Sequence, residues 1–383
     1  MAKRLNQLTT RSSPLVTRTA RSGANAAIAA QRLRNQRLTL AGFRRAADVV
    51  GWFGAMQAQE YEPAKWALGL RMREGTLAAE IERAFEQGEI LRTHVMRPTW
   101  HFVTPADIRW LTELTAPRVR RMMAVYHRRL ELDTRIFVRS TALIEKALGD
   151  GATLTRTELG ERLRSAGLMF TGERLGHLAM YAELEGVICS GPRRGKKFTY
   201  ALVAQRAPGA PRFSRDESLA TLARRYFSSH GPATIRDFVW WSGLTTADAR
   251  RGLEMINAHR EDGGDTTYWT VGSPPRGATR DHLAHLLPVY DEYLVAYRDR
   301  HAVPHGPSTI ARGSSASPSV TFQHALIIGG QVAGTWRRMQ KSKTMAVDVV
   351  PVRPLTRPER HALEEATGRY ERFLSTPVDV SIR

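Results

Sequence analysis

The sequence predicts a mainly α fold with α+β elements, built from three tandem winged-helix units and a small C-terminal β-rich domain. Three helical segments followed by two short strands occupy residues 42–103, and the same order recurs at 141–203. A third set of helices follows at 219–256, and a spacing of roughly 70–90 residues suits tandem modules rather than a short-period solenoid. The predicted limits are 38–137, 138–206 and 212–272 for the three winged helices and 280–383 for the β-rich domain.

The first unit begins with a helix over residues 42–53, in which apolar residues recur at a helical period. These residues are Phe43, Ala46, Ala47, Val50 and Phe53. Two further helices are predicted over 62–73 and 76–87, and strands over 90–95 and 99–103. Three helices followed by a two-stranded wing form the element order of a winged helix.

The second unit repeats this order more clearly. Helices are predicted over 141–148, 155–165 and 173–185, and strands over 187–190 and 198–203. Thr155 and Glu158 form a capping-box pattern at the start of the middle helix. The third helix is interpreted as a recognition helix. The tip at 191–197 is basic, as is typical where such wings meet a nucleic-acid backbone, although an ordinary exposed hairpin has the same composition. Its candidate contacts are Arg193, Arg194 and Lys196.

The third unit follows a linker at 207–211 that contains proline and glycine. Its helices are predicted over 219–230, 234–241 and 246–256. Trp240 and Trp241 lie at the end of the middle helix, and both are interpreted as core residues rather than as a platform for base stacking.

Short strands dominate the C-terminal region. They are predicted over 324–328, 332–338, 345–350 and 378–382, with a helix over 358–373. The hairpin tip at 339–343 is basic, which makes it a candidate to probe a DNA groove. Its basic residues are Arg337, Arg338, Lys341 and Lys343.

The first 37 residues are basic, and no acidic residue precedes Asp48. Because their apolar periodicity is poor, we predict a mobile, disordered basic tail over residues 1–37. Its composition also fits an organellar transit peptide. A tail that adds nonspecific DNA affinity, or an upstream start codon, is the favoured interpretation.

The charge balance indicates a polyanionic partner. Lysine and arginine number 57 against 37 acidic residues, which gives a net charge of +20. Such a surplus attracts phosphates, and arginine can bind phosphate or guanine edges through two hydrogen bonds. A GC-rich genome also enriches arginine, but that bias alone does not explain the shortage of acidic residues.

Cysteine use and hydropathy bear on the compartment. Cys189 is the single cysteine, so no internal disulfide can form, which indicates a reducing compartment and excludes a cysteine-rich zinc site. Apolar runs are shorter than the ~18–20 residues of a membrane helix. The N-terminus lacks the apolar segment of a signal peptide. We expect a soluble, intracellular protein.

Several enzyme signatures are missing from the sequence. We find no Walker loop, no GxGxxG after a strand, no HExxH and no GxSxG. His282 and His285 form an HxxH pair on an amphipathic stretch, which is a weak metal signal. We therefore expect neither a metal nor another cofactor.

One short motif is a candidate for chemistry. Gln57 and Gln59 are separated by one residue, so their side chains point the same way if the backbone is extended there. Each amide offers two donors and an acceptor without a charge, and such a pair can hold a water molecule against a sugar carbon. By its pattern alone, the motif is equally typical of a surface loop.

Further motifs give the pair a context. The segments are Gln57-Ala58-Gln59, Arg97-Pro98-Thr99-Trp100-His101, His230-Gly231-Pro232-Ala233-Thr234, Trp241-Ser242-Gly243-Leu244, 286–294 running to Arg298-Asp299-Arg300, and Gly334-Thr335-Trp336-Arg337. Together they resemble the winged-helix DNA glycosylases of the AlkZ/YcaQ type, from about Leu38 to the C-terminus. Pro98 replaces a glycine expected in this family. The QxQ form is more similar to the AlkZ branch, which is associated with bulky adducts and interstrand crosslinks.

The resemblance implies a monofunctional DNA glycosylase that removes N7- or N3-alkylated purines from double-stranded DNA. Gln57 and Gln59 would position the attacking water. Thr99, His101 and Asp291 are expected to line the site, although His101 could equally pack in the core and Asp291 could pair with an arginine. Further DNA contacts are assigned to Arg97, Arg298 and Arg300. We expect a monomer in the bacterial cytoplasm, associated with the nucleoid.

Two other interpretations remain open from the sequence. A noncatalytic winged-helix transcriptional regulator fits the predicted fold and charge equally well, because a fold does not determine a function. It differs from a glycosylase in having no use for paired amides in a cleft. An RNA-binding scaffold fits less well, because no aromatic RNP-type strand is present.

Overall fold

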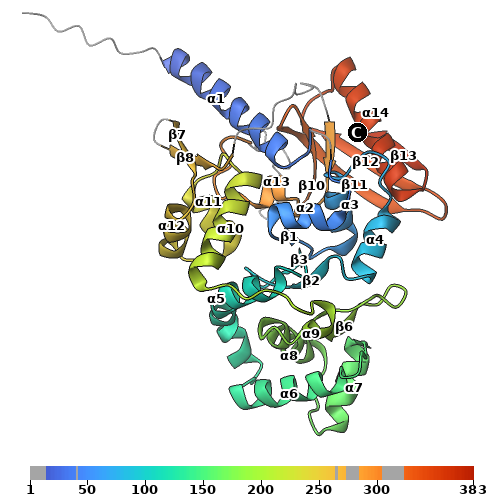
Figure 1. Cartoon of the computed structure of the whole chain (residues 1–383). Helices are drawn as coiled ribbons and strands as arrows, with labels where there is room; N and C mark the ends of the chain where they lie inside the picture. Colours follow the sequence, from blue (N-terminus) through green and yellow to red (C-terminus); the bar gives the residue numbers. More distant parts are fainter. Residues whose placement is uncertain (1–13, 40–41, 264–265, 273–283, 304–322) are drawn as a thin grey trace, which may run out of the picture.

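The computed structural model describes residues 14–39, 42–263, 266–272, 284–303 and 323–383, with side chains from residue 23 onward. In Figure 1 the first helical unit (blue) lies at the centre. The third unit (yellow) and the C-terminal sheet (orange to red) flank it, and the second unit (green) lies at the far end. None of the described helices combines the length and the apolar character needed to cross a membrane.

The first unit contains three helices and a small antiparallel sheet of order β1-β3-β2. Its elements are α2 (Ala46–Phe53), β1 (Met56–Gln57), α3 (Tyr61–Gly69), α4 (Ala78–Glu86), β2 (Leu91–His94) and β3 (Trp100–Val103). The three helices and the two predicted strands are confirmed. The prediction missed β1 and the long helix α5 (Ile108–Arg129) that connects this unit to the second one.

The second unit has the predicted helices and wing. Its elements are α6 (Thr134–Ala147), β4 (Leu154–Thr155), α7 (Arg156–Ser165), α8 (Gly172–Leu184), β5 (Ile188–Ser190), β6 (Thr199–Leu202) and α9 (Val203–Arg206). The predicted capping box is confirmed, since the hydroxyl of Thr155 accepts from the Glu158 N–H while the Glu158 carboxylate accepts from the Thr155 N–H at 2.7 Å. This reciprocal pair fixes the start of α7.

The third unit also places a strand pair after three helices. Its elements are α10 (Arg215–Ser229), α11 (Ile235–Ser242), α12 (Thr246–Glu254), β7 (His259–Gly263) and β8 (Thr266–Thr270). Trp241 is fully buried, as predicted. The same prediction is wrong for Trp240, which is 46% exposed although its indole N–H donates to the carbonyl of Val295 at 2.9 Å.

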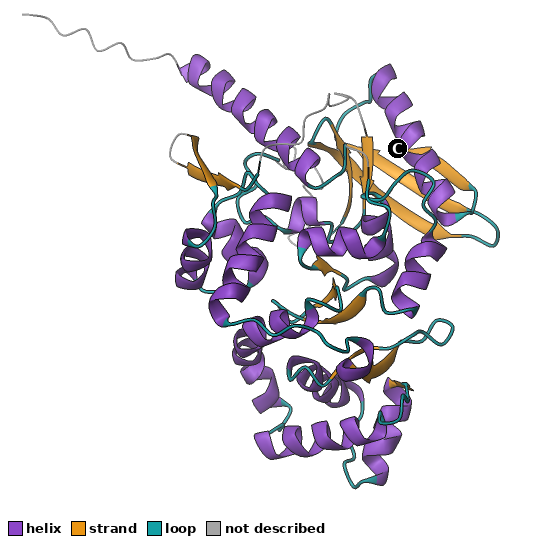
Figure 2. Ribbon diagram, in the orientation of Figure 1, coloured by secondary structure: helices purple, strands orange, loops and turns teal. Residues whose placement is uncertain are grey.

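A five-stranded sheet forms the C-terminal region, and Figure 2 shows its strands in orange beside the closing helix. Its elements are β9 (Ala284–Leu287), α13 (Glu292–Val295), β10 (His324–Ile328), β11 (Gln331–Gln340), β12 (Met345–Pro351), α14 (Arg357–Leu374) and β13 (Val378–Ile382). The strand order is β13-β12-β11-β10-β9, and only β12 and β13 run parallel. The four strands and the helix predicted here are confirmed.

One continuous hydrophobic core joins the C-terminal sheet to the first unit. Trp66 of α3 packs against Tyr370 and Phe373 of α14, with ring centroids 4.8 and 4.9 Å apart. Its indole N–H donates to the carbonyl of Leu286 in β9 at 2.6 Å. The sheet therefore supports the unit that carries the two glutamines.

The predicted disordered tail is wrong for most of its length. Residues Pro14–Asn35 form helix α1, while the first 13 residues lie outside the described part of the chain. Three polar side chains at the end of α1 are buried against distant partners. Arg32 donates to the carbonyl of Pro232 at 2.9 Å, Asn35 to that of Gly231 at 2.7 Å, and Gln36 to the hydroxyl of Tyr297 at 3.0 Å. The basic composition of this segment suggested that it is solvated. That prediction failed because the acceptors that bury its side chains are about 200 or more residues away in sequence.

Candidate active site

The two glutamines lie on one face of the first sheet. In β1, Gln57 is opposite His101 of β3, and the Ala58 N–H donates to the carbonyl of Trp100 at 2.7 Å. Met56 and Ala58 are buried, whereas Gln57 and Gln59 are half-buried. This alternation is that of an extended backbone, so the two amides share a side, as the spacing predicts.

Two partners hold Gln57. Its side-chain oxygen accepts from Arg97 Nη2 at 3.0 Å, and its main-chain N–H donates to Glu292 Oε1 at 2.8 Å. Arg97 was predicted to contact DNA, but it is half-buried behind the glutamine, and the same Nη2 lies 3.5 Å from His101 Nε2. Gly243 helps to place this arginine: with φ +70° it ends α11, and a Cβ there would overlap the carbonyl oxygen of Met96.

Gln59 is held from the main chain. Its side-chain oxygen accepts from the Trp100 N–H at 3.3 Å. Arg92 fixes the backbone of the motif by donating to the carbonyls of Ala58 at 2.9 Å and of Gln59 at 3.4 Å. Each glutamine oxygen thus uses one of its two lone pairs on the protein.

His101 and Thr99 lie on the same face as the glutamines. Burial, and secondarily the charge of Arg97, lowers the pKa of His101 to about 3, so the imidazole is neutral. Its Nδ1 lies 2.9 Å from the carbonyl of Thr99, which assigns the proton to Nδ1 and leaves Nε2 as an acceptor. The hydroxyl of Thr99 is buried and has no hydrogen-bond partner among the described residues.

Sequence reasoning missed Glu292, the acidic residue next to the predicted Asp291. Asp291 forms a buried ion pair with Arg71, with both oxygens at 2.8 Å, so of its two possible roles the structure shows the pairing. Glu292 instead faces the motif: besides Gln57, it binds Trp241 Nε1 at 2.9 Å and His230 Nε2 at 3.3 Å. Sequence alone could not tell which of two adjacent carboxyls faces the glutamines.

Glu292 is ionised although it is buried. Burial opposes the charge, but the hydrogen bond from His230, the Gln57 N–H and the charge of Arg97 lower its pKa to about 2. The anionic carboxylate therefore binds the main-chain N–H of Gln57, while the guanidinium of Arg97 binds its side chain.

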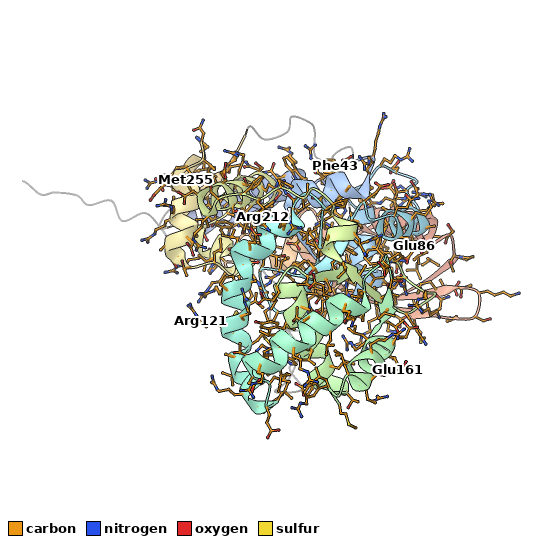
Figure 3. All side chains as sticks on the ribbon, turned by 60° about the horizontal axis from the view of Figure 1, so that its bottom comes forward. Phe43, Glu86, Arg121, Glu161, Arg212 and Met255 are labelled. Atoms are coloured by element: carbon orange, nitrogen blue, oxygen red, sulfur yellow. The ribbon has the colours of Figure 1, made fainter. Side chains whose placement is uncertain are left out.

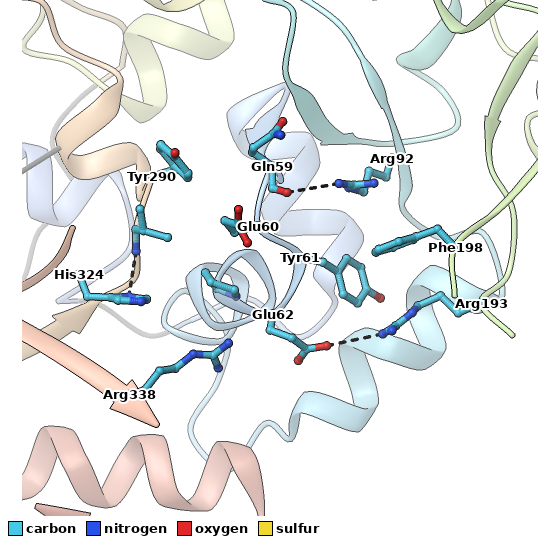
Figure 4. Close-up of a pocket in the computed structure, with 12 residues that line it drawn as sticks. Gln59, Glu60, Tyr61, Glu62, Arg92, Arg193, Phe198, Tyr290, His324 and Arg338 are labelled. Atoms are coloured by element: carbon cyan, nitrogen blue, oxygen red, sulfur yellow. Dashed lines mark hydrogen bonds and ion pairs between the residues drawn. The ribbon is translucent and has the colours of Figure 1, made fainter. Parts of the chain in front are cut away.

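A cavity of about 710 Å³ opens at Gln59 (Figure 4). It is lined by Gln59, Glu60, Tyr61, Glu62, Pro63, Arg92, Arg193, Phe198, Val289, Tyr290, His324 and Arg338. Tyr290 has a left-handed backbone, with φ +62°, which is uncommon for a residue with a large side chain. The volume is within the range of about 300–1,000 Å³ typical of ligand sites. Gln57 is not among these lining residues; it lies two residues before Gln59 along the extended backbone.

Comparison with known proteins identifies the fold and its chemistry. The sequence model of the family described as "DNA glycosylase AlkZ-like" matches residues 50–373. The chain belongs to this family. It is 27% identical over 316 residues to the interstrand DNA cross-link repair glycosylase of Streptomyces sahachiroi, which covers 76% of this chain and 81% of the relative. The solved structure of the DNA glycosylase AlkZ from Streptomyces sahachiroi matches with a TM-score of 0.71 at 22% identity, covering 93% of this chain and 99% of that one.

The predicted basic residues of this AlkZ-like DNA glycosylase fall into two groups. Some are bound within the protein: Arg193 lies 3.2 Å from Glu82, Arg194 lies 2.7 Å from Glu158, Arg338 donates to the Tyr370 hydroxyl, and Arg300 is half-buried. Others are exposed: Lys196, Arg298, Arg337, Lys341 and Lys343. Lys341 makes only a long contact with Asp379, at 3.8 Å. The exposed group therefore holds the better candidates for DNA contacts.

The glycosylase carries a further exposed basic surface on α5, which the sequence analysis did not predict. Figure 3 shows Arg121 on the outward side of this helix. Arg118 and Arg128 are exposed on it as well.

Of the HxxH pair, which the sequence analysis gave as a weak metal signal, only one histidine falls within the described residues. His285 is buried in β9, and His282 lies outside the described residues. Within the part of the chain that the structure describes, no cluster of His, Cys, Asp or Glu could hold a metal ion.

Proposed function

We propose that this DNA glycosylase hydrolyses the N-glycosidic bond of N7- or N3-alkylated purines in double-stranded DNA and accepts bulky adducts or interstrand crosslinks. The curated relative is a crosslink repair glycosylase, and the cavity at Gln59 is larger than a single base requires. One observation supports this proposal most strongly: the side-chain oxygen of Gln57 is fixed by Arg97 and that of Gln59 by the Trp100 N–H.

The reaction needs little acid assistance, because alkylation at N7 or N3 makes the purine cationic. The C1′–N bond breaks with its electron pair going to the base, and the sugar becomes oxocarbenium-like. The free lone pairs of the Gln57 and Gln59 oxygens accept O–H bonds from one water and direct its oxygen to C1′. A new C–O bond forms, a water proton passes to solvent, and an abasic sugar remains.

A monofunctional reaction also fits the residues around the cavity. A bifunctional glycosylase attacks the sugar with an amine and forms an imine. No lysine is among the described residues that line the cavity at Gln59. We infer that water held by the two amides is the nucleophile.

Glu292 acts as a positioning residue in this mechanism. Its carboxylate holds the main chain of Gln57 and lies near Arg97, whose guanidinium holds the side chain of the same residue. Because both contacts are partly or fully buried, they are stronger than they would be in water.

The three helical units act as winged helices in DNA binding. Each places a strand pair after three helices, and the exposed Lys196 and the hairpin lysines Lys341 and Lys343 are suitably placed to bind phosphates. We assign the protein to the cytoplasm, at the nucleoid, as a monomer without a cofactor.

The decisive experiment incubates the purified protein with a duplex that carries one N7-methylguanine. Heating in alkali then cleaves any abasic site, and the cut strand is measured on a denaturing gel. We expect cleavage that depends on both enzyme and lesion, and release of free base without strand cleavage before the alkali step. Lesion binding without base release at saturating enzyme would favour the transcriptional regulator instead.

A further inference from the structure

A second cavity, of about 420 Å³, lies between the sheet of the first unit and the sheet of the second. Its lining comes from β2, β3, β4, the first turn of α7, β5, β6 and the wing: Arg92, Trp100, Thr155, Arg156, Thr157, Ser190, Lys197, Phe198, Thr199 and Tyr200. Arg92 and Phe198 also line the cavity at Gln59, so the two cavities are neighbours. Trp100 connects them, because its N–H binds Gln59 while the residue lines the second cavity.

The walls of the second cavity are suited to a flat aromatic group. Trp100 and Phe198 are half-buried and Tyr200 is buried. The guanidinium of Arg92 lies between the first two rings, 4.4 Å from the centroid of Trp100 and 4.6 Å from that of Phe198. Its hydrogen bond to the carbonyl of Ala58 keeps it there. Nucleobases stack on planar walls of this kind.

The charge of the same cavity favours an anion. Arg92, Arg156 and Lys197 line it, and no aspartate or glutamate is among the described lining residues. Two carboxylates near the cavity are bound within the protein: Glu158 to Arg194 and the backbone of Thr155, and the buried Glu183 to His94 and the indole N–H of Trp100. Arg156 and Thr157 also lie in the first turn of a ten-residue helix, where the helix dipole adds positive potential. A planar aromatic group joined to an anion is the chemistry of a nucleotide.

We propose that this cavity is a subsite for one nucleotide of the substrate DNA other than the nucleotide that is excised. Its base stacks against the aromatic walls on the side open to the cavity, and its phosphate binds Arg156 and Lys197. An uncharged adduct on the damaged base would stack on the aromatic walls but would not bind the two cationic side chains. The inference rests on the proposed function, which puts the excised nucleotide at Gln59. The walls replace the stacking that a nucleotide loses when it leaves the duplex.

The test uses a duplex with a 2′-fluorinated N7-methylguanine, whose glycosidic bond resists hydrolysis, and with 2-aminopurine placed in turn at each flanking and opposite position. For the wild-type protein we expect a fluorescence change at one position besides the lesion. Thr157→Trp fills the cavity from its exposed rim, so it should abolish this change and weaken binding about tenfold. Thr134→Trp, at the exposed first position of α6, is the matched control and should do neither.

A second pair of variants tests the charge. Lys197→Ala should weaken lesion binding more than Lys196→Ala, because the two lysines are neighbours on the wing but only Lys197 lines this cavity. Thermal melting confirms that each variant is folded. A folded Thr157→Trp protein with unchanged fluorescence and affinity would overturn the proposal. So would displacement of the wild-type signal by free deoxyguanosine monophosphate, which would assign the cavity to a free nucleotide.

A parallel assay separates this proposal from the proposed function. Wild-type protein is incubated with the hydrolysable form of the lesion, and base release is measured. If the wild type releases the base and Thr157→Trp leaves the fluorescence change and the affinity unaltered, the subsite is wrong and the glycosylase function stands. No release by the wild type means that the glycosylase function is wrong, and the subsite is then judged from the binding data alone.

Discussion

Gln57 and Gln59 are held by different partners, a guanidinium and a main-chain N–H, yet both oxygens face one side of the sheet. If they position one water together, Gln57→Ala and Gln59→Ala should each lower the single-turnover excision rate by ~10²–10³ while lesion binding persists. The double variant should be scarcely slower than the slower single variant, because the two groups act as a unit. Gln87→Ala, at the exposed end of α4, is the control and should excise normally. Normal excision by the double variant at saturating enzyme would contradict the mechanism.

Glu292 gives a second prediction at the residue scale. Glu292→Gln keeps the size of the side chain but removes its charge, and it brings a second donor toward the indole N–H of Trp241. We expect a slower single-turnover rate with an unchanged Kd for lesion DNA, since the variant loosens Gln57 and not the DNA contacts. It should also destabilise the fold by about 1–3 kcal/mol, the usual effect of an unsatisfied buried group.

Asp291→Asn is the matched control for Glu292. It breaks the buried ion pair with Arg71, so it should reduce the free energy of unfolding by about 3–5 kcal/mol. Because Asp291 does not contact Gln57, the excision rate of the folded fraction, measured below the melting range, should stay close to the wild-type value. Equal loss of rate in the two variants would show that Glu292 has only a structural role.

At the scale of elements, the sequence predicted those features that depend on residues close together in the chain. The capping box of Thr155 and Glu158 and the strand pattern of the C-terminal hairpin depend on neighbours within a few residues. The strand β1 has only two residues, and it exists because β3 pairs with it from more than 40 residues away. Its pairing places Gln57 and Gln59, so the motif could be found from the sequence although its geometry could not.

The hairpin between β11 and β12 gives a prediction for DNA binding. Lys341 and Lys343 are exposed at its tip, so charge reversal of both to Glu should weaken duplex binding and make its salt dependence less steep. The melting temperature should hardly change, because exposed substitutions usually alter stability by no more than ~0.5 kcal/mol. The matched control reverses the exposed Arg135 and Lys146 on α6, which changes the net charge equally. An equal loss of affinity in the control would indicate a general charge effect and not a hairpin contact.

At the scale of the whole molecule, α1 connects parts that the sequence analysis treated as separate. Asn35 accepts through its carbonyl from the indole of Trp52 in the first unit and donates through its side chain to Gly231 in the third. Gln36 accepts from Arg71, the arginine that pairs with Asp291 one residue before Glu292. Composition could not reveal this role, because a basic segment without apolar periodicity looks solvated until its distant acceptors are known.

This connection predicts different effects for two truncations. Removal of residues 1–13, which precede α1, should leave the melting temperature unchanged and lower duplex affinity only through the loss of Lys3, Arg4 and Arg11. Removal of residues 1–37 deletes the buried part of α1 and takes away the donors to the carbonyls of Gly231 and Pro232, while Tyr297 keeps its hydrogen bond to the carbonyl of His230. Each carbonyl that loses its donor typically costs about 1–3 kcal/mol. We therefore expect a much lower melting temperature or an insoluble protein, measured by calorimetry on both truncations. If the protein of residues 38–383 had the same melting temperature as the full-length chain, α1 would not stabilise the core.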